Sequence, residues 1–239
     1  MRTLTIADPA LLGAKPSYAS IVLGLAPLAY WPMQETSGTT LTALVGSNGT
    51  YANGPTLAAA GPSARIPNGV SFDGSNDYAS AAIDLSGTAE ITVSFWMWRD
   101  SFSNDDRMAL ELSSTPDSLR SFSIDPNHYL GRFAGVMAQG TSVWRASGIT
   151  RPSTSTWHHY VVRFSRSAQT VKFFVDGTAV TETAVFSGTV SGNFVSSTLY
   201  FMSRGGASLF CAGRLAEVAV FSGLLSDANC GLLCSAGLT

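Results

Sequence analysis

The stretch that decides the fold class is Ile91–Trp98, which reads ITVSFWMW. Large apolar side chains occupy every second position, at Ile91, Val93, Phe95 and Met97. Successive side chains of a strand point to opposite faces of a sheet, so a period of two places these four on one face. The stretch therefore predicts a β-strand with one face against a core.

Four further stretches have the length and the β-branched or aromatic content of strands. They are Trp157–Phe164, Val171–Val175, Thr198–Met202 and Leu215–Phe221. Asp176-Gly177 follows the second of them and predicts a tight turn, with a returning strand at Thr178–Thr181. Gly, Pro, Asn, Asp and Ser interrupt the chain about every ten residues, and no long helix is predicted. This pattern predicts an all-β fold in which two antiparallel sheets form a sandwich.

The two ends of the chain differ from this pattern. Residues 1–17 contain two prolines and no periodicity, so they predict an arm that becomes ordered on attachment to a partner. Ser17 is an expected N-cap for a short helix over Tyr18–Leu25. A second short helix is expected over Ser226–Ser235, after a final strand that it helps to close at a sheet edge.

Three cysteines, Cys211, Cys230 and Cys234, leave room for at most one disulfide. Cys230 and Cys234 are four residues apart in the expected helix, so their sulfurs lie on one face. Burial of that face is favoured over a disulfide or a metal site, because zinc sites need closer spacing and further ligands.

The charge of the chain is low and balanced. Fourteen Lys and Arg stand against sixteen Asp and Glu in 239 residues, which is 13% charged and a net charge of −2. No basic cluster is present, so a nucleic-acid partner is excluded. The longest apolar stretch, Ile21–Trp31, is too short for a membrane span, and Asp8 and Pro9 interrupt any signal peptide.

Several collinear segments resemble a known family. They are AYWPMQETSGTT (Ala29–Thr40), NGTY (Asn48–Tyr51), VSFDGSNDYA (Val70–Ala79), ITVSFWMW, WHHYVV (Trp157–Val162), VKFFVDG (Val171–Gly177) and GRLAEVAVFSGLLS (Gly213–Ser226). The chain is similar to the laminin-G-like, concanavalin-A-like jelly-roll domains of bacterial surface proteins and phage virion proteins. The resemblance implies a jelly roll over residues 18–239, preceded by the arm of residues 1–17.

Enzymes of this general fold place paired acids two residues apart on one strand, so that one protonates and the other attacks. No Glu-x-Asp-x-Glu run occurs here, and Glu217 is the one acid of its strand. His158 and His159 are adjacent on an expected strand, so they face opposite ways and do not serve one site. We therefore expect no catalysis, with a divergent glycoside hydrolase as the less favoured alternative.

The resemblance also implies a calcium ion as a candidate ligand, and calcium needs six to eight oxygen ligands. Glu35 matches the acid of the family's ETSG segment, and Glu217 matches the second acid of its last strand, whereas Ala216 replaces the first acid. Asp73, Asn76 and Asp77 form a second oxygen-rich set, and Asp100, Asp105 and Asp106 form a third. Turn capping is the alternative for each set, and it is favoured.

Glycan binding is what the resemblance implies for many relatives. A sugar needs an exposed flat ring and polar partners beside it. Trp98 and Trp144 stand next to polar loops and are the candidate platforms, and His128 and Tyr129 are expected to rim the same surface. The other tryptophans, Trp31, Trp96 and Trp157, are expected in the core.

These expectations lead to a main hypothesis and an alternative. The main hypothesis is a non-enzymatic phage virion protein that decorates the capsid or belongs to the tail or a fibre. The arm then binds other virion proteins, the domain forms a homo-oligomer, and the jelly roll faces host glycans from the particle surface. The alternative is a bacterial carbohydrate-binding lectin or adhesin.

Overall fold

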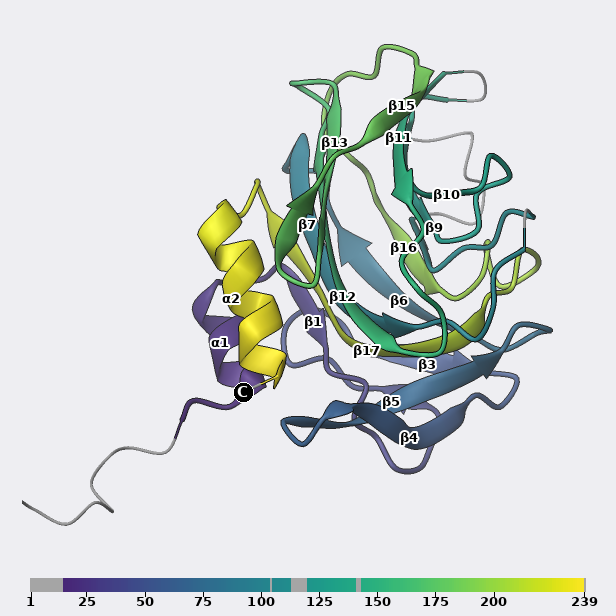
Figure 1. The fold of residues 1–239 in the computed structure, drawn as a ribbon, viewed down its shortest axis with the longest axis vertical. Coiled ribbons are helices and arrows are strands. Elements are labelled where there is room, and N and C mark those ends of the chain that lie inside the picture. Colours follow the sequence, from purple (N-terminus) through teal and green to yellow (C-terminus); the bar gives the residue numbers. More distant parts are fainter. Residues whose placement is uncertain (1–14, 104, 113–119, 141–142, 239) are drawn as a thin grey trace, which may run out of the picture.

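The computed structural model describes residues 15–103, 105–112, 120–140 and 143–238. These residues fold into two antiparallel sheets packed face to face, with two helices on one side (Figure 1). The predicted all-β, two-sheet jelly-roll sandwich is therefore confirmed. Most of the predicted arm lies outside the described residues, so the boundary at residue 17 stays a prediction.

One sheet, called sheet A, contains the strands that the sequence predicted most clearly. Its strands are β1 (Ala29–Trp31), β4 (Thr56–Ser63), β5 (Ile66–Asp73), β7 (Glu90–Trp98), β12 (Trp157–Ser165), β13 (Thr170–Val175), β14 (Thr178–Val180) and β17 (Ala212–Ser222). They pair in the order β14-β13-β12-β7-β17-β5-β4, and β1 also pairs with β17. The predicted strand at Ile91–Trp98 is β7, which has β12 on one side and β17 on the other.

The second sheet, called sheet B, was largely missed by the sequence patterns. Its strands are β2 (Thr40–Leu41), β3 (Gly49–Ala52), β6 (Tyr78–Asp84), β8 (Leu110–Leu112), β9 (Phe122–Asp125), β10 (Arg132–Ala138), β11 (Trp144–Thr150), β15 (Thr183–Ser187) and β16 (Ser196–Phe201). Their order is β15-β11-β10-β9-β8-β16-β6-β3-β2. Only β16 corresponds to a predicted strand, Thr198–Met202.

The main core fills the space between the sheets, and stacked rings join the two sheets there. Tyr160 of β12 lies between Phe95 of β7, at 5.4 Å between ring centroids, and Phe133 of β10, at 4.5 Å with the rings nearly parallel. Such ring pairs add about 0.5–1.5 kcal/mol beyond the area they bury. The predicted alternation is confirmed, because Phe95 and Met97 are fully buried in this core.

The helices cover the outer face of sheet A. Helix α1 spans Tyr18–Gly24, with Ser17 as the predicted N-cap, and α2 spans Asp227–Leu238. They pack beside each other over Trp96 and its neighbours (Figure 1). The expectation that α2 closes a sheet edge is wrong: the strand before it, β17, is internal to sheet A, and the outer face beside it is apolar and needs a cover.

The remaining predictions about buried residues are mostly confirmed. Cys230 and Cys234 are buried residues of α2 and, like Cys211, are free thiols. Trp31 and Trp96 are buried as predicted, whereas Trp157 is only partly buried, because it begins β12 at the end of the sheet. His158 and His159 face opposite ways, towards Tyr160 and Trp96 respectively. No helix of the described residues has the length and apolar character to cross a bilayer.

A bulge in β17 lets this strand pair with two partners on one side. The first part of β17 pairs with β5 and the later part with β1, and the pairing with β7 shifts between Ala216 and Ala219. Glu217 lies in the shift with a φ of 57°, and its N–H donates to the Pro32 carbonyl at 3.0 Å. Its buried carboxyl accepts a hydrogen bond from the Tyr30 hydroxyl. Burial raises the pKa of Glu217 to about 8, although the Tyr30 bond acts in the opposite direction.

This raised pKa makes the stability depend on pH. Above pH 4.5 the unfolded chain loses the Glu217 proton, whereas the native state keeps it up to about pH 8. The native state therefore binds the extra proton, and the free energy of unfolding falls as pH rises through this range, by at most about 1.4 kcal/mol per pH unit. We expect Glu217→Gln to reduce this slope between pH 6 and 8 in urea denaturation, and the slope that remains comes from Asp125, because burial raises the pKa of that carboxyl to about 8 as well.

Glu90→Gln is the matched control, because hydrogen bonds from the Ser165 and Ser167 hydroxyls lower the pKa of Glu90. Glu90 is ionised above pH 6 in both the folded and the unfolded protein. The control variant should therefore keep the wild-type slope. Equal slopes in the wild type and Glu217→Gln would show that Glu217 is already ionised in the folded protein.

Candidate functional site

A cavity of about 180 Å³ opens on the outer face of sheet B. It is called the sheet B pocket. In β8 and β9, Leu110 and Ile124 point into the core, so Glu111 and Ser123 point outwards into the pocket. In β10 the same alternation turns Val136 outwards, because Met137 is in the core. The pocket is therefore built on the polar face of a sheet whose other face is apolar.

Four rings form one side of the sheet B pocket and are called the aromatic wall. They are Tyr129 and His128 from the β9–β10 loop, Phe186 of β15 and Trp144 of β11. Successive ring centroids lie 4.6 Å apart for Tyr129 and His128, 6.0 Å for His128 and Phe186, and 6.2 Å for Phe186 and Trp144. Tyr129 is 50% exposed, so its ring is open to a ligand.

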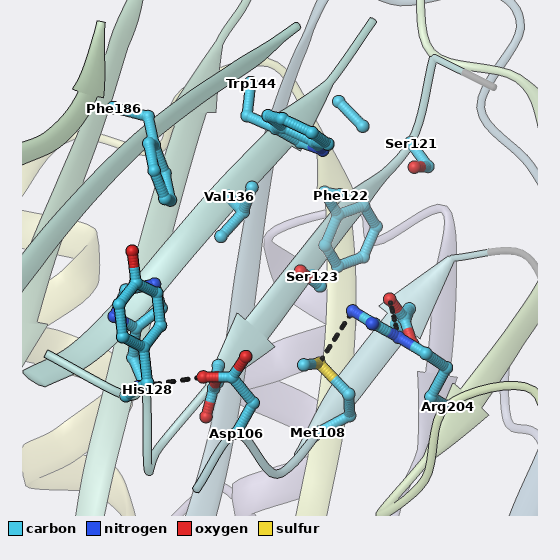
Figure 2. Close-up of a pocket in the computed structure, with 14 residues that line it drawn as sticks. Asp106, Met108, Ser121, Phe122, Ser123, His128, Val136, Trp144, Phe186 and Arg204 are labelled. Carbon is cyan, nitrogen blue, oxygen red and sulfur yellow. Dashed lines mark hydrogen bonds and ion pairs between the residues drawn. The ribbon is translucent and has the colours of Figure 1, made fainter. Parts of the chain in front are cut away.

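Polar and charged side chains form the other side. Figure 2 shows Asp106, Met108 and Arg204 across the hollow from Phe186 and Trp144. The Arg204 Nε lies 3.1 and 3.0 Å from the two carboxylate oxygens of Glu111, which is fully buried. This ion pair neutralises both partners, so the remaining charge of this side comes from Asp106 and its neighbour Asp125.

Asp106 and Asp125 form an acidic pair beneath the aromatic wall. Asp125 is 1% exposed, and its Oδ1 accepts from the N–H groups of Asn127 at 2.7 Å and Arg107 at 3.1 Å. Its Oδ2 is buried and meets no donor, and it faces the Asp106 carboxyl. Burial is the main reason why the pKa of Asp125 rises to about 8, and Asp106 raises it as well. Two neighbouring carboxyls do not both ionise at low cost, which is why Asp106 adds to the effect of burial on Asp125.

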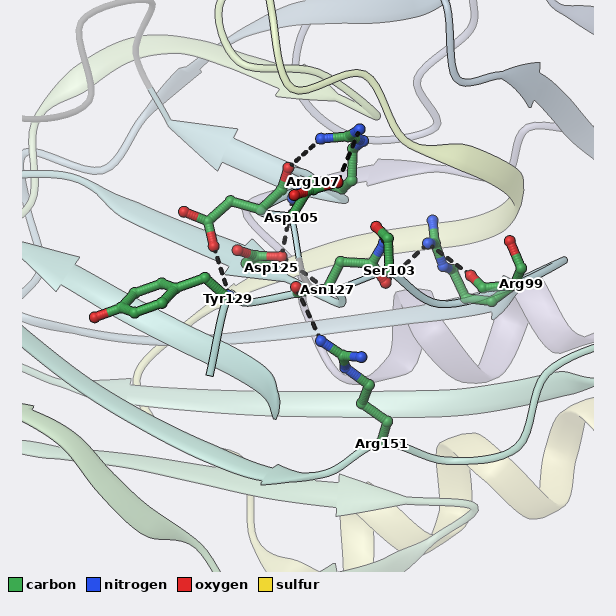
Figure 3. Close-up of polar contacts among 10 residues, drawn as sticks. Arg99, Ser103, Asp105, Arg107, Asp125, Asn127, Tyr129 and Arg151 are labelled. Carbon is green, nitrogen blue, oxygen red and sulfur yellow. Dashed lines mark hydrogen bonds and ion pairs between the residues drawn. The ribbon is translucent and has the colours of Figure 1, made fainter. Parts of the chain in front are cut away.

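The loop that presents the aromatic wall is fixed from two sides. Figure 3 shows Arg99 and Arg151 reaching the Asn127 segment. Arg99 donates to the Asn127 Oδ1 at 3.0 Å, and Arg151 donates to the carbonyls of Asn127 and His128 at 3.0 Å each. Asp106 accepts from the Tyr129 N–H at 2.8 Å. The rings are therefore held in place before any ligand arrives.

His128 is neutral in this environment. Burial lowers its pKa, and the opposing effect of Asp106 is smaller. Its Nδ1 accepts from the Leu130 N–H at 3.3 Å, so the proton of the neutral ring sits on Nε2. The ring thus offers one donor and no charge to the pocket.

Three of the four residues predicted for glycan contact meet at this pocket: Trp144, His128 and Tyr129. Trp98 does not belong to it, and this part of the prediction is corrected. Trp98 lies at the end of β7 on the outer face of sheet A, where its ring contacts Trp157 and is covered by the Arg214 guanidinium at 4.9 Å. The sequence around Trp98 shows a ring beside a polar loop, but not that Arg214 covers it.

The residues predicted as calcium ligands are engaged in local hydrogen bonds. Glu35 accepts from the Thr42 N–H at 2.7 Å and the Tyr51 hydroxyl at 2.9 Å, whereas Glu217 accepts from Tyr30 and Gln34. The two acids therefore serve separate partners. Across the described ranges, no three His, Cys, Asp or Glu side chains are grouped as a metal site.

The Asp73–Asp77 segment is a capped turn. Asp73 accepts from the N–H groups of Ser75 at 2.7 Å and Asn76 at 3.3 Å, and these bonds lower its pKa. Asp77 accepts from the Asp73 N–H at 3.2 Å. In the third predicted set, Asp100 accepts from the Trp98 indole and Asp105 lies near Arg107, while Asp106 lines the sheet B pocket.

The sequence analysis missed most of the residues that line the pocket, among them Glu111, Asp125, Phe186 and Arg204. Glu111 had a usable signal, because an acid between two leucines in the short run LEL points away from the core that those leucines enter. Phe186 and Arg204 had none, since they reach the site only through the pairing of strands that are distant in sequence.

Solved structures of similar fold are found among proteins of low sequence identity. One is domain 4 of AbnA, a GH43 extracellular arabinanase from Geobacillus stearothermophilus, in complex with arabinotriose; it has 13% identity and a TM-score of 0.61, with 87% of this chain and 98% of that one covered. Another is the botulinum neurotoxin serotype D ligand-binding domain with N-acetylneuraminic acid, at 11% identity and a TM-score of 0.65, covering 92% and 52%.

A third is the sialidase of Trypanosoma rangeli in complex with the inhibitor DANA, at 13% identity and a TM-score of 0.58, covering 96% of this chain and 35% of that one. The chain thus spans about half of the toxin domain and about a third of the sialidase. None of the curated proteins compared with the chain matches it in sequence.

The family is shown by the sequence itself. The model of the concanavalin A-like lectin/glucanase superfamily of laminin G type matches residues 73–230. This range includes β7, β12 and β17 of sheet A and every strand that lines the sheet B pocket. The chain therefore belongs to the concanavalin A-like lectin/glucanase superfamily, as a lectin-like jelly-roll domain.

Proposed function

We propose that this protein binds a glycan in the sheet B pocket and does not hydrolyse it. The observation that supports this proposal is the aromatic wall, which stands across a small cavity from polar side chains. The C–H faces of a sugar stack on rings, and its hydroxyls need donors and acceptors at the opposite side. The pocket offers both within one cavity.

The size of the cavity fits a single sugar ring. Its volume of about 180 Å³ lies below the ~300–1,000 Å³ of pockets for drug-sized ligands. Tyr129 is exposed enough to continue the contact outside the cavity. We therefore infer that one ring of a glycan enters and that the next ring lies over Tyr129.

The similar structures agree with a sugar ligand, since the arabinanase domain holds arabinotriose and the toxin domain holds N-acetylneuraminic acid. Identity to both is far too low to transfer a ligand or a contact residue. Their sugars support the class of ligand only.

The acidic pair argues against hydrolysis. The two carboxyls of a glycosidase stand about 5–9.5 Å apart, so that the glycosidic bond lies between them. Asp125 is 1% exposed and its Oδ1 is held by the N–H groups of Arg107 and Asn127, so its carboxyl is not presented to a glycosidic bond beside Asp106. Glu111, the third acid of the pocket, is held by Arg204. We therefore assign none of the three acids of the pocket to hydrolysis.

We further propose that the domain is displayed on a phage particle, as a capsid decoration or a tail or fibre component, and that residues 1–17 attach it as a homo-oligomer to other virion proteins. Two features support this part: the segment YASIVLGLAPLAYWPMQETSG (Tyr18–Gly38) resembles phage members of the family, and only 13% of the residues of the chain are charged. The jelly roll would then be the part that meets host glycans.

Replacement of Trp144 tests the binding proposal. We expect Trp144→Ala to weaken glycan binding by at least about tenfold, or about 1.4 kcal/mol, because the ring at one end of the aromatic wall is lost. Binders are identified on a glycan array, and their affinities are then measured by NMR titration of the ¹⁵N-labelled protein. Trp98→Ala is the matched control and should bind as the wild type does. Loss of binding in Trp98→Ala alone would contradict the proposed site.

The absence of hydrolysis has its own test. Glycans that bind on the array are incubated with the protein, and products are followed by mass spectrometry. We expect intact glycans after prolonged incubation. Cleavage that disappears in Asp125→Asn would overturn the non-enzymatic proposal, since this variant keeps the Oδ1 acceptor for Asn127 and Arg107.

The virion proposal is tested with purified particles. We expect mass spectrometry to detect the protein in them, and deletion of residues 2–14 to remove it from particles while the domain stays folded. The deletion keeps Ser17, which caps α1. Normal incorporation of the shortened protein would show that the arm is not the attachment segment.

A further inference from the structure

Acidic side chains outnumber basic ones among the described residues that line the sheet B pocket. Arg204 is its one cationic lining residue among those the structure describes, and both oxygens of Glu111 engage its Nε. The undescribed internal stretches, residues 104, 113–119 and 141–142, contain no Lys or Arg and one Asp. His128 adds no charge, because burial lowers its pKa. A carboxylate on a ligand would find no free cation among the described lining residues.

The acidic pair gives the pocket a negative charge. Asp106 and Asp125 both line the pocket, and no Lys or Arg of the described residues forms an ion pair with either carboxyl. The nearby guanidiniums are directed elsewhere: Arg151 binds the carbonyls of Asn127 and His128, and Arg107 lies near Asp105. The Asp106 carboxyl accepts from the Tyr129 N–H at 2.8 Å, and this neutral donor does not offset its charge.

We propose that the sheet B pocket selects uncharged sugars and rejects carboxylated ones, sialic and uronic acids included, with Asp106 as the residue that determines this specificity. This inference rests on the proposed glycan binding. A sugar carboxylate in the pocket would lie beside a like charge in a partly desolvated site, where repulsion is poorly screened. A neutral ring meets no such cost, and its hydroxyls can donate to Asp106.

The test uses pairs of probes that differ only in charge. They are methyl β-glucoside with methyl β-glucuronide, methyl β-galactoside with methyl β-galacturonide, and N-acetylneuraminic acid with its methyl ester. Binding is followed at pH 7 by shifts of the Tyr129 backbone N–H and the Trp144 indole in NMR titrations. We expect the neutral member of each bound pair to bind at least tenfold more tightly.

Asp106→Asn should reduce this ratio to less than about threefold. The amide oxygen still accepts from the Tyr129 N–H, whereas the negative charge of the side chain is removed. Asp105→Asn is the matched control, because Asp105 is exposed and lies outside the pocket, and it should keep the full ratio. The ratio is measured within one variant, so partial loss of folded protein affects both probes equally.

The outcomes separate the two proposals. A carboxylated probe that binds as tightly as its neutral partner overturns the inference and leaves the proposed function standing. An unchanged ratio in Asp106→Asn overturns the role of Asp106. If neither the probes nor any arrayed glycan, neutral or acidic, binds, the proposed function fails and the inference fails with it.

Discussion

The bulge at Glu217 is the constraint on which the arrangement of sheet A depends. A regular strand offers each edge to one partner, but β17 must join β7 on one edge and both β5 and β1 on the other. The left-handed conformation of Glu217 turns the strand at the point where β5 gives way to β1, and its N–H is satisfied by Pro32. The price is a buried acid, which Tyr30 and Gln34 contact. Because β1 is held here, Trp31 enters the core between the sheets while Tyr30 faces the helices.

The two outer faces of the sandwich differ in what covers them, because one is apolar and the other is polar. The outer face of sheet A is apolar, with Trp96, Val161 and Phe174, and α1 and α2 cover it. The outer face of sheet B has Glu111, Ser123 and Asp125 at the equivalent positions, and loops rather than helices surround it. Burial of the first face stabilises the fold. The polar residues of the second face line the sheet B pocket, so the first face stabilises the fold and the second is the face to which we assign binding.

The sequence allowed sheet A to be predicted better than sheet B, and the reason is physical. Strands such as β7 and β12 have long runs of large side chains on the core face, which give a clear period of two. In sheet B, Gly135 takes a core-facing position of β10 against Val171 and Phe164, and Gly148 of β11 packs on Arg132. Only small residues fit where neighbours approach so closely. Because they are not large apolar residues, they interrupt the alternation of apolar and polar positions that identifies a strand. Local context singled out Trp144, His128 and Tyr129 as rings beside polar loops, and the fold brings these three to one pocket, although His128 is buried there. It failed for Trp98, since only the folded chain brings Arg214 over that ring.

The acidic pair shows why such a group persists in a binding site. Burial of Asp125 costs free energy, as its raised pKa indicates. Yet the same side chain connects the loop before β8, through the Arg107 N–H, with the loop after β9, through the Asn127 N–H. Asp106 extends the connection to Tyr129. A neutral apolar residue at position 125 would pack more cheaply but would leave two buried N–H groups without acceptors, and the loops that position the aromatic wall would separate. In the function that we propose, the charge that would disfavour an acidic sugar belongs to the same carboxyls that hold the rings in place, so rigidity and selectivity of the pocket would have one origin.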